Sequence, residues 1–319
     1  MVHQTGTRDA VAPGGAVKGL CEYGDEVARA IATKAPIVAL ETTVVTHGLP
    51  HPDGLATALA FEQVVRDAGA TPATIGILGG AIRIGLTRTE LERLATTPNV
   101  AKINLSNLAA AVASGQPGST TVAATMFAAC AGSIRVFATG GIGGVHRGAG
   151  DSGDISADLT ALSRIPVAVV SAGAKAILDL PRTVEMLETL GVPVFGFETD
   201  EFPAFYRRST GLPVDRRYDS IAELAAAVTR HLSLGLGTGV LVANPIPAAD
   251  EMPVALYDRA LHTALSEADA RGIRGRAVTP LLLDRMCAVT GGQSVRANVA
   301  LLRHNAHVAA RLAAAIDGI

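Results

Sequence analysis

Lys175 stands in a sequence setting that favours nucleophilic chemistry. It lies in SAGAKAILDL, a stretch of small and apolar residues. An apolar environment disfavours the ammonium form, and a free amine is a nucleophile that forms Schiff bases with sugar or keto carbonyls. The alternative is a surface lysine that extends along the protein and keeps its charge in water. A cation at the start of a helix would oppose the helix dipole, and this favours the nucleophile.

Glu41 is the next candidate, because it interrupts the apolar run PIVALETTVV at 36–45. A carboxylate is costly to bury without a partner, and burial favours the protonated form that a general acid needs. A carboxylate held in a hydrogen-bond network at the end of a strand is the alternative. Lys102, in NVAKINLSNL, is either an anion-binding residue or a surface lysine. We interpret His47 and His51 as loop residues rather than ligands.

Three aspartates, Asp151, Asp154 and Asp158, lie within the segment DSGDISAD. Carboxylate oxygens are the ligands that Mg²⁺ and Mn²⁺ prefer, and a cation held by one or two of them would keep most of its waters. The alternative is a solvated loop in which Asp154 or Ser156 caps the following helix.

A glycine-rich run, FATGGIGGVHRGAG at 137–150, precedes these aspartates. It does not match the dinucleotide-binding pattern G-x-G-x-x-G, because His146 occupies the position of the third glycine. Glycines let backbone N–H groups approach an anion closely, with His146 or Arg147 to assist. A plain turn is the other interpretation.

The sequence around these residues alternates between apolar runs typical of strands and stretches typical of helices. Apolar runs predict strands at 36–45, 71–80, 135–141, 166–173, 192–197 and 239–247. Helical periodicity predicts helices at 53–70 and 183–191, and Ser220 with Glu223 has the capping-box pattern of a third. This alternation predicts a three-layer α/β/α sandwich around a mostly parallel or mixed sheet. Because ligands bind beyond the carboxyl ends of such strands, we expect Glu41, His146 and Lys175 to meet there.

Composition limits the possible functions. The chain has 319 residues, 49% of them hydrophobic, with a formal net charge of -2. We expect a lead-in at 1–20 and one catalytic domain at 21–319. The sequence has no basic run for a nucleic acid and no apolar stretch for a membrane span. The three cysteines are widely separated, so we expect no structural zinc, no disulfide and a cytoplasmic setting.

With these residues assembled, the chain resembles the pseudouridine-5′-phosphate glycosidases, also called the indigoidine-synthase-A-like family, from about residue 36 to about residue 304. The resemblance implies reversible cleavage of the C–C glycosidic bond of pseudouridine 5′-phosphate to uracil and ribose 5-phosphate. It also implies dependence on a divalent cation, typically Mn²⁺, and a homotrimer of α/β/α subunits. The matching stretches are ALETTVVTHGLPHP, GATPATIGILGG, GSTTVAATM, VFATGGIGGVHRGA, DISADL, SAGAKAILDL, GVPVFGF, VANPIP and TGGQSVRAN.

The resemblance also implies roles for individual residues. Lys175 matches the Schiff-base nucleophile, Glu41 the proton donor and Asp154 the metal-binding carboxylate; Asp158 is a second candidate for proton transfer. The positions that match substrate contacts are Lys102, Val122, His146, Ser156, Ala157, Asp158 and Asn298.

Two departures from the family pattern stand out. The run INLSN at 103–107 replaces a polar S-R-R-D run, so two positive charges are missing beside Lys102, and Gly153 stands where an aromatic residue is common. Two rival functions remain open. One is a Schiff-base aldolase that acts on a sugar phosphate, and the other is a sugar-phosphate-binding protein without activity.

Overall fold

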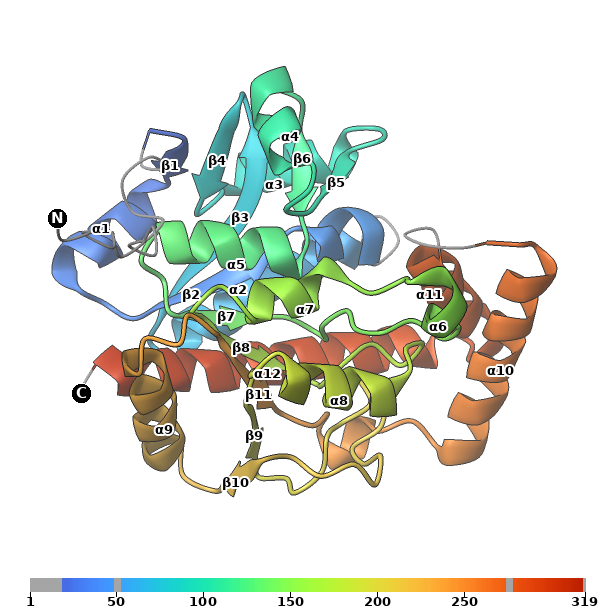
Figure 1. The fold of residues 1–319 in the computed structure, drawn as a ribbon. Coiled ribbons are helices and arrows are strands. Elements are labelled where there is room, and N and C mark those ends of the chain that lie inside the picture. The colour runs from blue at the N-terminus through green and yellow to red at the C-terminus, as the bar shows by residue number, and fades with distance from the viewer. Residues whose placement is uncertain (1–18, 49–52, 274–277, 318–319) are drawn as a thin grey trace, which may run out of the picture.

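A single 11-stranded sheet organises the residues that this computed structural model describes, which are 19–48, 53–273 and 278–317 (Figure 1). The strands are β1 (Cys21–Tyr23), β2 (Ile37–Glu41), β3 (Thr71–Leu78), β4 (Ala81–Ile84), β5 (Ala101–Ile103), β6 (Gly118–Thr120), β7 (Val136–Ala138), β8 (Ala168–Ser171), β9 (Val194–Phe197), β10 (Arg216–Tyr218) and β11 (Val240–Ala243). Residues 1–18 of the predicted lead-in lie outside the described residues, and the domain boundary at residue 21 stays a prediction.

The sheet is flanked by helices of very different lengths. These are α1 (Asp25–Thr33), α2 (Asp53–Asp67), α3 (Arg88–Thr96), α4 (Leu108–Ser114), α5 (Val122–Ala131), α6 (Ala149–Ser152), α7 (Ala157–Leu162), α8 (Leu180–Thr189), α9 (Ile221–Ser233), α10 (Val254–Ala270), α11 (Val278–Val289) and α12 (Gln293–Asp317), with a π-helical turn η1 (Val44–Gly48) and a 3₁₀ turn η2 (Ala248–Asp250). No helix among the described residues combines the length and the apolar content that a membrane span requires.

The strand order confirms the predicted mixed, mostly parallel sheet. The main path runs β1-β4-β3-β2-β7-β8-β11-β9-β10, and β6 joins it beside β3 while β5 pairs with β6. Strand β3 pairs antiparallel with β4 and β6, and the other pairings between these strands are parallel. The carboxyl ends of β2, β7, β8 and β11 therefore meet at one edge of the sheet.

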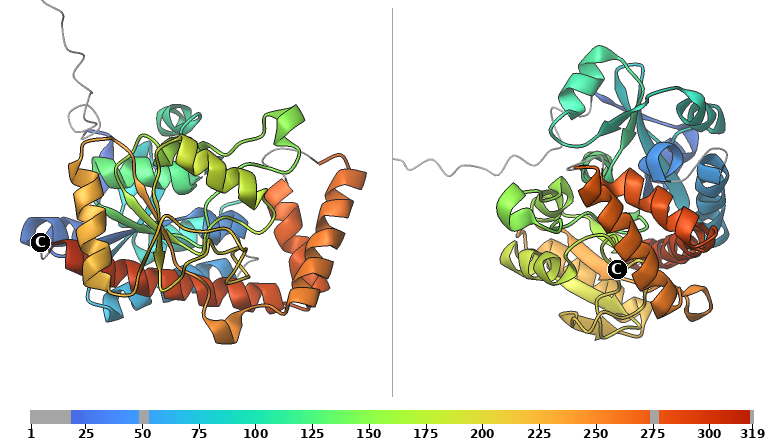
Figure 2. Two further views of the ribbon diagram at one scale, coloured as in Figure 1. Left: turned by 60° about the horizontal axis from the view of Figure 1, so that its bottom comes forward. Right: turned by 90° about the vertical axis from the view of Figure 1, so that its right-hand side faces the viewer.

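Helices cover both faces of the sheet, as predicted for an α/β/α sandwich. In Figure 2 the long red helix α12 lies on one side of the sheet and the green helices α5 and α7 lie on the other. Helix α2 packs against α12, and α5 packs against α7. All residues of β7, β8 and β11 are buried, because helices cover both of their faces.

Two local predictions were wrong. The strand predicted at 36–45 ends at Glu41, because the hydroxyl of Thr42 donates to the carbonyl of Ile75 at 2.8 Å and the chain turns into η1. The capping box predicted at Ser220 does not form. Ser220 is the residue before helix α9, and its carbonyl accepts the first helical bond, from the N–H of Leu224 at 3.0 Å. The side chain of Ser220, however, makes no capping hydrogen bond to the helix.

Candidate active site

A cavity of about 450 Å³ opens at the carboxyl ends of β2, β7 and β8. Glu41 is the last residue of β2, Thr139 follows β7, and Lys175 follows β8. The walls of this cavity contain every site residue predicted from the sequence, which are Glu41, Lys102, Val122, His146, Asp154, Ser156, Ala157, Asp158, Lys175 and Asn298. Parallel strands end together, so residues far apart in the chain converge here.

Lys175 reaches the cavity from a loop that continues the pairing of β7 and β8. Beyond the two strands, Ile142 and Ala174 form an isolated parallel bridge, and the N–H of Lys175 donates to the carbonyl of Ile142 at 3.0 Å. The next helix, α8, begins only at Leu180, so Lys175 does not lie at a helix start and the helix dipole does not act on it as predicted from the sequence. Its half-buried side chain lines the cavity.

Lys102 enters the site through strand pairing that is remote in sequence. It lies on β5, which pairs with β6, and β6 pairs with β3. Burial lowers the pKa of Lys102, the charge of Lys175 lowers it further, and the charges of Glu41 and Asp158 raise it. Lys175, Glu41 and Asp158 thus all act electrostatically on Lys102 within one site.

Asp158 is fixed by backbone donors. It is buried in the first turn of α7, which Ser156 caps by accepting the N–H of Asp158 at 3.2 Å. One of its carboxylate oxygens, Oδ1, accepts the N–H of Ala123 at 3.0 Å, and the other, Oδ2, accepts the N–H of Gly143 at 2.8 Å. Ser156 rather than Asp154 thus provides the predicted helix cap.

The glycine-rich run allows this close approach. A Cβ on Gly143 would lie 2.3 Å from Ser156 Oγ and 2.8 Å from Asp158 Oδ2, and one on Gly144 would lie 2.4 Å from Thr183 Oγ1. The run leads into α6, which has four residues and a glycine at its N-cap. Its glycines therefore serve loop packing and the backbone bond to Asp158.

Asp154 and His146 face each other across the loop that contains α6. The backbone N–H of His146 donates to the carbonyl of Asp154 at 3.0 Å, and His146 Nδ1 lies 3.9 Å from Asp154 Oδ2. Burial lowers the pKa of His146, Asp154 raises it, and Lys175 and Lys102 lower it further. Among the described residues, no three or more His, Cys, Asp or Glu side chains gather as a metal cage. One cavity-lining carboxylate with an imidazole beside it fits a cation that keeps most of its waters.

Glu41 is held by two hydroxyl groups. Thr139 Oγ1 donates to Oε1 of Glu41 and Thr43 Oγ1 donates to Oε2. Both threonines are buried, whereas Glu41 is half-buried and lines the cavity. Glu41 is therefore both a hydrogen-bonded carboxylate at the end of a strand and a residue of the candidate site.

Sequence reasoning missed several cavity residues. Thr43 and Thr139 lie within two of the stretches that match the family, but the sequence alone gives neither of them a chemical role. His47, interpreted as a loop residue, lies in η1 and lines the cavity. Burial lowers the pKa of His47, Lys102 lowers it further, and a backbone hydrogen bond with Val100 raises it. His51 lies outside the described residues.

The INLSN segment also belongs to the cavity wall, where Asn104, Ser106 and Asn107 line it. The side chain of Asn107 donates to the carbonyl of Lys102 at 3.1 Å and accepts the N–H of Asn104 at 2.8 Å. The neutral side chain of Asn107 thus holds the INLSN segment beside Lys102 through hydrogen bonds.

Asn298 reaches the cavity from α12. Its side chain is buried, and its Oδ1 atom has no hydrogen-bond partner among the described residues. Buried polar atoms are almost always hydrogen-bonded, so an unpaired amide oxygen in a cavity wall indicates a place for a ligand donor.

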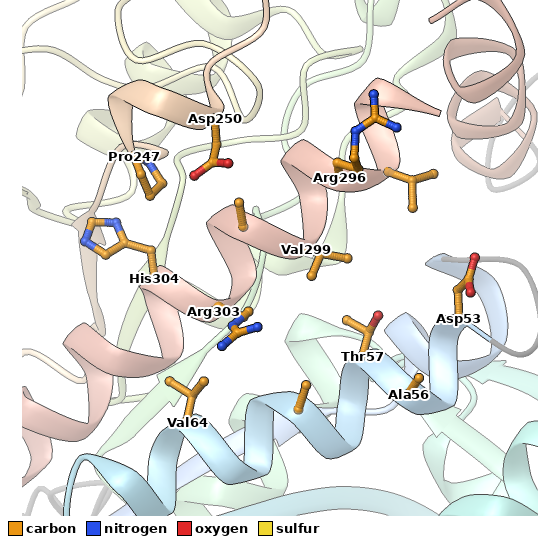
Figure 3. Close-up of a pocket in the computed structure, with 13 residues that line it drawn as sticks. Asp53, Ala56, Thr57, Val64, Pro247, Asp250, Arg296, Val299, Arg303 and His304 are labelled. Carbon is orange, nitrogen blue, oxygen red and sulfur yellow. The ribbon is translucent and has the colours of Figure 1, made fainter. Parts of the chain in front are cut away.

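A second hollow, a groove of about 880 Å³, lies between α2, α12 and η2 (Figure 3). None of its lining residues borders the cavity of Lys175. Its charged side chains include Asp53, Asp250, Arg296 and Arg303, and Figure 3 shows Arg303 over the space between the two helices. These charges are of both signs, and no lysine or cysteine is among the described residues that line the groove, so these residues offer no comparable chemistry.

The chain is similar to known proteins over most of its length. The pseudouridine-5′-phosphate glycosidase of Methylobacterium nodulans is 54% identical, covering 94% of this chain and 89% of that protein. The corresponding protein of Caldanaerobacter subterraneus subsp. tengcongensis is 49% identical, with 93% and 96% covered.

Two solved structures share the fold. The prealnumycin C-glycosynthase AlnA, crystallised with ribulose 5-phosphate, superposes with a TM-score of 0.87 at 41% identity, covering 94% of this chain and 97% of that one. An indigoidine synthase A-like protein from Thermotoga maritima superposes with a TM-score of 0.84 at 35% identity, covering 93% and 97%. Residues 26–315 match the family model described as "Indigoidine synthase A like protein". The chain belongs to the indigoidine synthase A-like family.

Proposed function

We propose that this chain is a pseudouridine-5′-phosphate glycosidase, which reversibly cleaves pseudouridine 5′-phosphate to uracil and ribose 5-phosphate. The observation that carries the proposal is one cavity in which Lys175 lies with Glu41, Asp158 and Lys102. Relatives of that name are about half identical to this chain over more than nine tenths of its length. The family and the constellation of side chains support the same chemistry.

A lysine suits this reaction because the bond to be made or broken joins two carbon atoms. In the synthetic direction, the amine of Lys175 condenses with the aldehyde of open-chain ribose 5-phosphate and releases water. Carbon C5 of uracil attacks the iminium carbon C1′ and loses its proton. The ribose O4′ then displaces the lysine nitrogen as the ring closes, and the proton of its hydroxyl passes to that nitrogen, which leaves as the free amine of Lys175. Cleavage is the reverse sequence, in which C5 regains a proton as the C–C bond breaks.

The two carboxylates suit different tasks in this scheme. Asp158 accepts bonds from two backbone N–H groups, which only donate, so its partners match the carboxylate and not the acid. Glu41 is bonded to hydroxyl groups, which both donate and accept. We therefore assign proton transfer at O4′ to Glu41, and assign to Asp158 the stabilisation of positive charge on Lys102 and on the iminium that Lys175 forms.

A divalent cation, Mn²⁺ or a similar ion, fits beside Asp154. Its carboxylate would hold the ion, most of whose remaining ligands would be waters, with His146 nearby. When bound, such an ion supplies positive charge that orients an anionic substrate. Lys102, Val122, His146, Ser156, Ala157 and Asn298 are proposed to contact the substrate. We also propose a homotrimer, which the molar mass of the purified protein from light scattering tests.

The decisive test measures uracil released from pseudouridine 5′-phosphate, with and without Mn²⁺. We expect release that requires both the cation and Lys175. Borohydride reduction in the presence of ribose 5-phosphate should attach the pentose to the peptide that contains Lys175, as read by mass spectrometry. Labelling of another lysine would refute the assignment of the nucleophile.

The rival functions give different results in the same assays. An aldolase would cleave a sugar phosphate to an aldehyde without releasing uracil, and an inactive binding protein would retain ribose 5-phosphate without turnover at any Mn²⁺ concentration. The similarity to a C-glycosynthase favours one further candidate, a synthase that joins pentose phosphate to another aromatic ring. Such an enzyme would trap the pentose on Lys175 but not accept uracil.

A further inference from the structure

Each oxygen of Glu41 accepts from a threonine hydroxyl, but in the described part of the chain only one of the two hydroxyls has a second acceptor within reach. Thr139 Oγ1 donates to Oε1, and the described residues offer this hydroxyl no other acceptor. The hydroxyl of Thr43 lies between two acceptors, Oε2 of Glu41 and the carbonyl oxygen of Thr120, the latter at 3.1 Å. A threonine hydroxyl has one hydrogen, so Thr43 donates to only one of the two at a time.

We propose that Thr43 is a positioning residue whose hydroxyl reverses its hydrogen bond with each change in the protonation state of Glu41, and that Oε2 is the oxygen that carries the proton. The proposal rests on the function proposed above, in which Glu41 transfers a proton. It adds a residue and an atom to that assignment, since it names the oxygen that exchanges the proton with the substrate.

Each protonation state of Glu41 then has a complete set of hydrogen bonds. When the carboxylate is ionised, Thr43 donates to Oε2 and Thr139 donates to Oε1. When Oε2 carries the proton, its O–H donates to Thr43 Oγ1 or to the substrate, and Thr43 rotates to donate to the carbonyl of Thr120. Neither state leaves an unpaired donor on a buried hydroxyl, which would be costly. The carboxyl exchanges its proton without movement of the backbone.

The alternative acceptor is held in place independently of Glu41. Thr120 donates its N–H to Thr42 Oγ1 at 2.9 Å, and Thr42 Oγ1 in turn donates to the carbonyl of Ile75 at 2.8 Å. The carbonyl of Thr120 is therefore anchored between β2, β3 and β6. Thr43 itself is buried, which limits replacement of these bonds by bulk water.

The charged groups around Glu41 act in a different way. Lys102, Lys175 and Asp158 line the same cavity, and the charge of Glu41 acts on Lys102. They lie on β5, on the loop after β8 and on α7, and none of them offers both a donor and an acceptor on one rotating O–H. Substitution of Thr43 by valine removes the rotating hydroxyl group and leaves the three charged side chains in place.

The experiment compares T43V, T43S and the matched control T74V, using uracil release across pH. Thr74 is buried and donates to Oε1 of Glu62 at 2.6 Å, so T74V removes the same kind of bond outside the site. We expect T43V to lower kcat by about 10- to 100-fold with KM within about threefold, because it impairs one proton-transfer group. The basic limb of its kcat/KM profile for uracil release should move to higher pH, because Glu41 acts there as the acid that protonates O4′ and its ionised carboxylate loses a donor.

The other variants separate chemistry from packing. T43S keeps the hydroxyl and should reproduce the wild-type pH profile, and T74V should leave it unchanged. If T43V does not fold by circular dichroism, T43A makes the same comparison. A T43V enzyme with wild-type kcat and pH profile, or T43S as impaired as T43V, overturns the proposal. Wild-type protein that releases no uracil instead overturns the proposed function itself.

Discussion

At the scale of single residues, Gly143 is where the glycine-rich loop comes closest to the proposed catalytic groups. An added Cβ would lie 2.3 Å from Ser156 Oγ, so the loop or Asp158 must shift in G143A. We expect kcat to fall by about 10- to 100-fold, because misplacement of a site group by about 1 Å has effects of that size. Steady-state assays of uracil release measure this change.

The matched control is Gly150, which lies in α6 of the same loop. An added Cβ there would meet only Arg182 Nη1, at 3.5 Å, which is an ordinary contact. G150A should retain wild-type kcat within about twofold. Equal losses in both variants would show that the loop as a whole, and not the approach to Asp158, limits activity.

Asp154 is the residue through which the proposed cation requirement is tested. D154N should raise the Mn²⁺ concentration for half-maximal activity by about tenfold or more, since it removes the negative charge that attracts the ion. Its circular dichroism spectrum should match the wild type, because Asp154 is only partly buried. Asp151 is exposed on the same loop, and D151N serves as the control. An unchanged metal titration in D154N would contradict the assignment.

At the scale of elements, the helix caps provide a prediction about stability. Thr87 caps α3 with a complete capping box, in which its Oγ1 accepts the N–H of Glu90 at 3.3 Å and its N–H donates to Glu90 Oε2 at 2.8 Å. We expect T87A to lower the free energy of unfolding by about 1 kcal/mol. Urea denaturation measures the difference.

Ser220 is the natural comparison, because its side chain makes no cap bond to α9. S220A should change the free energy of unfolding by less than about 0.5 kcal/mol. A loss in S220A as large as in T87A would mean that the serine side chain caps α9 in solution.

At the scale of the whole molecule, Glu62 links stability to pH. This carboxyl is buried on α2, where it accepts from Thr74 Oγ1 at 2.6 Å and lies 3.2 Å from Arg66 Nη2. Burial raises the pKa of Glu62, and the bonds from Thr74 and Arg66 lower it only in part. The folded state therefore holds this proton more tightly than the unfolded chain.

The direction of the pH effect follows from linkage. The stability contributed by protonated Glu62 is fully present below the usual Glu pKa and is lost as pH rises through the raised pKa of the folded state. In E62Q the free energy of unfolding should fall less over this window than in the wild type, as measured by urea denaturation from about pH 4 to about pH 8. The partly exposed Glu92, which pairs with Arg88 at the surface, provides the control E92Q, which should follow the wild-type curve. A wild-type curve in E62Q would contradict the prediction.

Sequence periodicity predicted the parts of the fold whose causes are local. The apolar runs gave β3, β7, β8, β9 and β11 within a few residues, and helical spacing gave α2 and α8. Strands β5 and β6 were not predicted, since three residues carry little pattern and both depend on pairing that reaches β3. The end of β2 was misjudged because the Thr42 side chain, which turns the chain, bonds to a residue 33 positions away.

The residues of the candidate site were likewise predictable where the signal was local, and not where it depended on contacts between distant residues. Residues within recognisable motifs, such as Lys175 in SAGAK and Asp158 in DISAD, were found from the sequence and lie in the cavity. Thr139 was not, because its role depends on contact with Glu41, 98 positions earlier. His47, interpreted as a loop residue, lies in η1 and lines the cavity, a position that depends on the tertiary structure.

The order of residues along the chain indicates which segments are buried and which residue types carry the chemistry, because apolar periodicity and side-chain chemistry are local properties. The folded structure is needed to show that the lysines, carboxylates and threonines share one cavity, and which hydrogen bonds distinguish Glu41 from Asp158. Those distances depend on the order of strands in the sheet, which sets neighbours between residues tens of positions apart. Local pattern contains no such information, so the partners of a catalytic group become visible only in the folded chain.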